Sequence, residues 1–194
     1  MRRLLLILIL ILLSTTAWAQ LDGENLLQIR PPDYQISLQE RQGQQIVTEM
    51  IPAKETADNW SEQVATRIFL ETDVTPAQYQ EFSAQEWRIT CPDARLLPGT
   101  EGKDNGYPFS LWIQVCPRDT RTGGPEYAWF KAIRGQDNLY VVRKTFRFEP
   151  SEEQVKTWVH YLRSIRVCDP RRADAPCPPA GSKENKAAAA PAKP

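Results

Sequence analysis

Histidine is almost absent from this 194-residue sequence, in which His160 is the only one. Any Ser-His-Asp or Cys-His catalytic arrangement would have to use it. The sequence also has no G-x-S-x-G, H-E-x-x-H or glycine-rich phosphate-binding motif and no cluster of metal-ligating residues. We therefore predict no catalytic residue, no metal and no cofactor. Hydrolysis by a carboxylate pair stays open as the alternative, because 24 Asp and Glu residues are present.

An excess of positive charge is missing as well. Lys and Arg number 24, the same as Asp and Glu, and without Arg2 and Arg3 of the leader predicted below the balance is 22 basic to 24 acidic residues. Neutralising a nucleic-acid backbone needs a basic excess or a basic stripe. We expect no nucleic-acid partner.

The N-terminus has the pattern of a secretory signal peptide. Arg2 and Arg3 precede an uninterrupted Leu and Ile run, Leu4–Leu13, and Ala17 and Ala19 then form a small-x-small cleavage pattern. A run of this length is too short for a membrane-spanning helix, which needs about 20 residues. The sequence predicts cleavage after Ala19 and no transmembrane anchor after processing, with a retained anchor as the alternative.

Only four cysteines occur, and none of them has C-x-x-C spacing. A four-cysteine zinc site is thus disfavoured, whereas export to an oxidising compartment favours two disulfides. Four cysteines allow three pairings. Of these we favour Cys91 with Cys116 and Cys168 with Cys177, since the second pair would tie the C-terminal segment to the final helix.

Alternating apolar and polar residues predict an antiparallel sheet of about five to six strands. A hairpin is expected over 34–51, followed by a strand within 57–71, for which a helix is the alternative. The Gly- and Pro-rich segment 92–108 is expected to be a loop. Further strands are predicted at 108–116, 126–135 and 138–148.

Two helices are predicted from their capping patterns. Thr75, Pro76 and Gln78 indicate the start of the first, and its apolar residues are expected to face the core: Tyr79, Phe82 and Trp87. Ser151 and Gln154 indicate the second helix. His160 lies about 160° from the centre of that helix's apolar stripe and is expected to be exposed.

These elements predict one α+β domain, with two helices packed on the sheet. The expected organisation is a signal peptide (1–19), an irregular lead-in (20–33), the domain (34–168) and a C-terminal segment (169–194). That segment would be tethered by the second disulfide and then continue as a flexible Pro/Ala/Lys tail.

A binding surface is predicted on the sheet. If both helices cover one face, the other face would present Trp112, Arg143 and Arg147 to a partner or ligand. The simpler interpretation is that both arginines point outward into solvent.

Two stretches, "IPAKETADNWSEQVATRIFLET" and "AIRGQDNLYVVRKTFRFEPSEEQVKTWVHYLRSIRVCD", resemble a group of small exported proteobacterial proteins. The order of elements is also similar to that of the Mog1/PsbP-like sandwich. The first resemblance implies a periplasmic or secreted bacterial location and no activity. We therefore expect a non-catalytic module that binds a protein partner or small ligand in the cell envelope.

Overall fold

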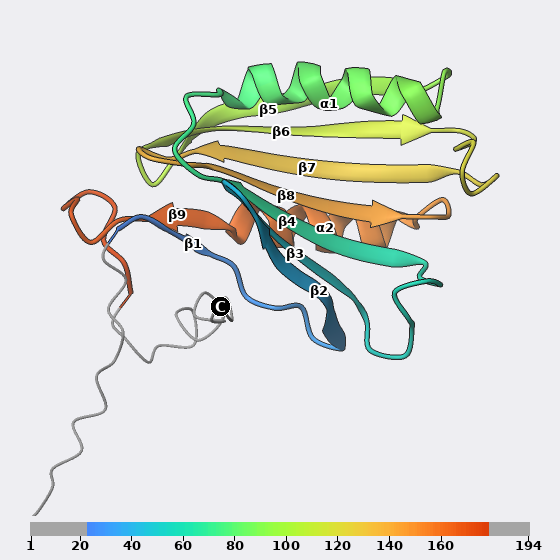
Figure 1. Ribbon diagram of the computed structural model, residues 1–194, viewed down its shortest axis with the longest axis horizontal. Coiled ribbons are helices and arrows are strands. Elements are labelled where there is room, and N and C mark those ends of the chain that lie inside the picture. The colour runs from blue at the N-terminus through green and yellow to red at the C-terminus, as the bar shows by residue number, and fades with distance from the viewer. Residues whose placement is uncertain (1–22, 179–194) are drawn as a thin grey trace, which may run out of the picture.

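The computed structural model describes residues 23–178, whose main feature is a seven-stranded antiparallel sheet in the order β2-β3-β4-β8-β7-β6-β5 (Figure 1). The predicted signal peptide with its cleavage site at Ala19, and residues 179–194 of the predicted tail, lie outside the described residues. The bounds of the seven strands are β2 (Tyr34–Gln42), β3 (Gln45–Pro52), β4 (Glu62–Phe69), β5 (Arg95–Asp104), β6 (Tyr107–Cys116), β7 (Glu126–Arg134) and β8 (Leu139–Phe146).

The sheet has more strands than predicted because β5 was expected to be a loop. Pro98 and Gly99 interrupt its periodicity, and a β-bulge lies between Leu97 and Thr100. Proline is tolerated here because β5 is an edge strand. A Cβ on Gly99 would come within 1.9 Å of the backbone oxygen of Leu111, so glycine is needed where the bulge crosses β6.

A second sheet pairs two short strands from opposite ends of the described chain, β1 (Asn25–Leu27) and β9 (Arg166–Cys168). The segment expected to be an irregular lead-in thus contains a strand. Leu26 and Ala175 are both buried in the larger hydrophobic core. The packed structure therefore extends beyond residues 34–168 at both ends.

The helices begin where the capping patterns predicted. Helix α1 spans Pro76–Thr90 and α2 spans Glu152–Ser164. Each has a reciprocal capping box, formed by Thr75 with Gln78 and by Ser151 with Gln154. These contacts satisfy backbone N–H groups that have no partner within the helix. Neither helix, nor any other between residues 23 and 178, is long and apolar enough to cross a membrane.

The two helices lie on opposite faces of the sheet (Figure 1). Alternate side chains of β7 show this arrangement, because Phe130 joins a cluster with Tyr79 of α1. Trp129 faces the other way, into the core that Trp158 of α2 covers. The condition on which the exposed surface was predicted, both helices on one face, is therefore not met.

Both disulfides have the pairing favoured from the sequence. Cys91–Cys116 joins the end of α1 to the end of β6, and Cys168–Cys177 closes the loop after β9. No cysteine is free. Two disulfides fit a protein of an oxidising compartment.

Candidate functional site

Helix α1 covers only part of its side of the sheet, because it packs against β6 and β7. Directly paired residues of an antiparallel sheet share a face, so the register identifies the side chains beside the helix. The pairs Ala65–Arg143, Arg67–Val141 and Phe69–Leu139 of β4 and β8 all lie on the α1 side. We call this α1-side surface of β3, β4 and β8 the open face.

A cleft of about 380 Å³ lies at one end of the open face, and four of the nine residues that line it are arginines. We call it the arginine cleft. Its positively charged and aromatic residues are Trp60, Arg67, Arg121, Arg143 and Arg147. Glu49 and Glu126 also line it, so the arginines outnumber the carboxylates by four to two. The cleft therefore favours an anionic group.

Two of these guanidinium groups have unused hydrogen-bond donors. Arg143 Nη2 donates to the Gln63 amide oxygen at 3.2 Å, and Arg147 stacks at 3.5 Å from the centre of the Trp60 ring. Their Nε atoms are buried and have no hydrogen-bond partner among the described residues. Within residues 23–178 neither arginine forms an ion pair. A buried, unpaired charge is costly, and a bound carboxylate would offset that cost.

The electrostatics of Arg143 reflect this situation. Burial lowers the pKa of its guanidinium, and the negative charge of Glu126 acts in the opposite direction. An arginine nevertheless stays protonated at any physiological pH. The cleft thus holds a permanent positive charge that is partly removed from water.

Arg121 differs because it already has a partner. Its Nη2 lies 2.7 Å from Asp119 Oδ2, and this guanidinium holds the pKa of Asp119 below its usual range. The loop that carries both residues is fixed to the end of α1, since Thr120 N donates to Thr90 O at 2.9 Å. The Cys91–Cys116 disulfide lies beside this contact. One wall of the arginine cleft is therefore held in place by a covalent link.

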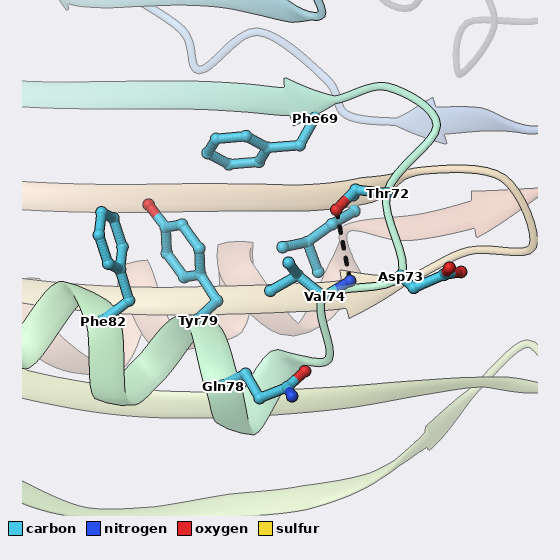
Figure 2. Close-up of a pocket in the computed structure, with 8 residues that line it drawn as sticks. Phe69, Thr72, Asp73, Val74, Gln78, Tyr79 and Phe82 are labelled. Carbon is cyan, nitrogen blue, oxygen red and sulfur yellow. Dashed lines mark hydrogen bonds between the residues drawn. The ribbon is translucent and has the colours of Figure 1, made fainter.

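A second, apolar pocket of about 620 Å³ opens at the other end of the open face (Figure 2). We call it the apolar pocket. Tyr79 and Phe82 of α1 project toward Phe69 of β4, and the Phe69 and Tyr79 ring centres are 5.4 Å apart. Phe82 was predicted to face the core, but it is 53% exposed. It projects beyond the edge of the cluster and forms part of the pocket instead.

The two cavities lie near each other on the open face. Arg67 lines the arginine cleft and Phe69, two residues along β4 on the same face, lines the apolar pocket. Burial raises the pKa of the Tyr79 hydroxyl, while Arg67 and Arg143 act in the opposite direction. Tyr79 of the apolar pocket is therefore within electrostatic range of both arginines. We call the two cavities together the groove.

Of the three predicted binding residues, Arg143 and Arg147 line the arginine cleft and Trp112 does not. Trp112 is 0% exposed and stacks on Phe130 with ring centres 5.0 Å apart. Placing it on an exposed surface was wrong because α1 covers that part of its face.

Sequence reasoning missed Trp60, Arg67 and Arg121. Arg67 carried a usable signal, since alternation along the strand places it on the same side as Ala65 and Phe69. Trp60 and Arg121 lie outside the strands, where periodicity says nothing about direction. Within residues 23–178, no three His, Cys, Asp or Glu side chains form a group that could hold a metal.

No family model and no curated protein matches this sequence. Among solved structures, PsbP (CyanoP) from Synechocystis has a TM-score of 0.50 at 9% identity, covering 80% of this chain and 98% of that one. The chain has a PsbP-like fold. The Ran-binding protein Mog1p of Saccharomyces cerevisiae has a TM-score of 0.45 at 10% identity, with 71% and 78% covered. LpqN of Mycobacterium tuberculosis, involved in cell envelope biogenesis, has 0.39 at 10% identity, with 77% and 86% covered. At such identities a PsbP-like fold says nothing about what the groove binds.

Proposed function

We propose that this chain is an exported, non-catalytic binding module of the bacterial envelope, which holds an anionic group of a partner or ligand in the arginine cleft. The observation that supports it is the pair Arg143 and Arg147, whose buried Nε atoms have no partner within the described residues. Guanidinium groups recognise planar anions through parallel N–H donors. Both guanidinium groups line the cleft before any ligand arrives.

The proposed periplasmic or secreted location rests on two observations. Residues 1–19 have the basic, apolar and small-residue pattern of a signal peptide. The four cysteines form two disulfides, which persist in oxidising compartments.

A binding role fits the groove better than hydrolysis by a carboxylate pair. The two carboxylates of the arginine cleft are engaged, because Glu49 accepts a hydrogen bond from Gln63 Nε2 at 3.1 Å and Glu126 lies 4.0 Å from Arg121. His160 is exposed on α2, on the opposite side of the sheet. It cannot reach a molecule in the cleft.

Side-chain NMR of the two Nε–Hε groups tests the proposal directly. Titration of the oxidised protein with glutarate, and separately with inorganic phosphate, should shift the Arg143 and Arg147 signals in a saturable way. Arg143→Gln should weaken binding about tenfold, the loss of one charge-assisted contact. Arg163→Gln removes a charge from the exposed end of α2 and should leave binding unchanged. Absence of saturable shifts with both anions, or equal weakening by the two variants, would contradict the proposal.

A further inference from the structure

The groove has two chemically different ends on one continuous face. The arginine cleft favours an anion, while five of the eight residues that line the apolar pocket are aromatic or aliphatic: Phe69, Val74, Tyr79, Phe82 and Leu139. The other three are Thr72, Asp73 and Gln78. Its volume of about 620 Å³ is within the range of sites that bind organic groups. An occupant that fills both ends must be acidic at one end and apolar at the other.

Strand β8 gives the distance from the apolar pocket to Arg143. Leu139 lines the apolar pocket and Arg143 lines the arginine cleft, four residues apart on β8. Four residues of extended chain span about 13 Å. In an extended peptide, residues i and i+4 are the same distance apart and point to the same side. An extended peptide can therefore place one side chain near Arg143 and another, four residues away on the same side of the peptide, near Leu139.

The composition of the groove favours a peptide over a lipid chain. Trp60, Tyr79 and the arginines are of the residue types that contribute most binding energy at protein interfaces. Every cation lining the arginine cleft is an arginine, the side chain suited to forked contact with a carboxylate. Phe82 and Val74 stay 53% and 39% exposed, whereas small-molecule sites enclose most of their ligand.

The chain's own C-terminal residues are a poor occupant on charge grounds. Residues 179–194 contain three lysines, Lys183, Lys186 and Lys193, and a single acidic residue, Glu184. A positive segment does not complement a positive cleft. The occupant is therefore a different, acidic chain.

We propose that the groove binds an extended acidic segment of a partner protein. An Asp or Glu side chain would lie in the arginine cleft, and an aromatic or large aliphatic side chain four residues away would lie in the apolar pocket. This inference rests on the proposed function, because it assigns a ligand class to the same anionic subsite.

Short synthetic peptides test it. The reference peptide is acetyl-Glu-Thr-Ser-Thr-Phe-amide, added to the oxidised full-length protein and followed by backbone and arginine side-chain NMR. Binding with a Kd of about 1 mM or tighter is expected. Replacing Glu by Gln, replacing Phe by Ser, or deleting one spacer residue should each weaken binding about tenfold. The deletion acts because it turns the two anchors to opposite sides of the peptide.

Variants of the protein assign each anchor to its end of the groove. Arg143→Gln should remove the preference for Glu over Gln and keep the preference for Phe over Ser. Phe82→Ser should remove the preference for Phe over Ser and keep the preference for Glu over Gln. Ile89→Ser is the matched control, since Ile89 is an 81% exposed apolar residue of the same helix outside the apolar pocket, and it should change neither preference.

The outcomes separate this inference from the proposed function. Saturable binding of glutarate without any dependence on the peptide's Phe or spacing would overturn the inference and leave the proposed function standing. Tighter binding to phosphatidylglycerol vesicles than to the reference peptide, lost in Arg143→Gln, would overturn it in favour of a lipid surface. Failure of both glutarate and phosphate to bind would remove the proposed function as well.

Discussion

Arg143 and Lys144 are neighbours on β8, yet they lie in opposite environments. Lys144 faces α2 and is fully buried, with its Nζ 2.5 Å from Glu62 Oε2 and 2.7 Å from the Tyr34 hydroxyl. It also lies 3.8 Å from the centre of the Trp158 ring. Arg143 faces the open side and has no ion pair within residues 23–178. One strand thus presents a satisfied charge to the closed face and an unsatisfied charge to the open face.

The same contrast extends to the next strand. Lys131 of β7 also points toward α2, where its Nζ donates to Asp104 at 2.7 Å and to the Ile165 backbone oxygen near the end of that helix. The buried lysines therefore connect elements of the fold, while Arg143 and Arg147 of the open face are expected to contribute less to its stability. A charge that stabilises the fold has partners within the fold. A charge that is available to a ligand lacks such a partner.

The largest effect is expected from Lys144→Ala, which should lower the free energy of unfolding by about 4 kcal/mol. The substitution leaves a cavity and removes the partner of Glu62 and Tyr34. Urea unfolding monitored by circular dichroism measures the change. A cost below about 1 kcal/mol would mean that the ion pair contributes no more than a surface pair, and the contrast with Arg143 would fail.

The buried cluster of Tyr34, Glu62 and Lys144 could not be predicted from the sequence. The capping boxes at Thr75 and Ser151 were predicted because their signals are local, within four residues. Tyr34, Glu62 and Lys144 are far apart in the chain and meet only when β2, β4 and β8 are placed, and a buried lysine contradicts the polar-outward pattern. The wrong placement of Trp112 has a similar cause. Alternation shows which side chains share a face of the strand, but it does not show which face a helix covers.

The next effect concerns the two disulfides. Replacing Cys91 and Cys116 together by Ala should cost about 3.5 kcal/mol, since the crosslink closes a loop of sequence separation 25. Replacing Cys168 and Cys177 should cost somewhat less, about 2.5 kcal/mol, for a separation of 9. Only the replacement of Cys91 and Cys116 should also weaken glutarate binding, because that disulfide anchors one wall of the arginine cleft. Equal weakening by both pairs would indicate a general loss of stability instead.

A pH effect follows from the closed face. Burial lowers the pKa of Lys144 to about 8, opposed by Glu62, from an ordinary value of 10.5. Between these values the unfolded chain binds more protons than the folded chain, so the free energy of unfolding rises with pH. The rise from pH 8 to 10 should be about 2 kcal/mol. Above pH 10 the trend should reverse, because burial raises the pKa of Tyr34 and Tyr140 and the unfolded chain then loses protons first.

Urea unfolding across pH 7 to 11 measures this profile. Lys144→Met should flatten most of the rise between pH 8 and 10, whereas Arg143→Gln should keep it. An unchanged slope in the Lys144→Met protein would mean that another group causes the rise, with Lys131 the next candidate because burial also lowers its pKa.

Arg143→Gln should leave the free energy of unfolding unchanged or raise it by up to about 1 kcal/mol, because it removes a half-buried charge without an ion-pair partner in the described part of the chain. Anion binding should weaken in the same protein. A loss of more than about 2 kcal/mol would show that Arg143 supports the fold as Lys144 does, and the division between the two faces would no longer hold.

The smallest effect is expected at His160, the only histidine of the chain. It lies on the exposed side of α2, while Leu162 and Ile165 of the same segment are buried. An exposed helical position without a cap or a buried partner contributes little, so His160→Ala should change the free energy of unfolding by less than about 0.5 kcal/mol. Glutarate and peptide binding should be unaffected, because the groove lies across the sheet. A loss of binding in His160→Ala would place a functional contact on the closed face, and the assignment of function to the open face alone would then be wrong.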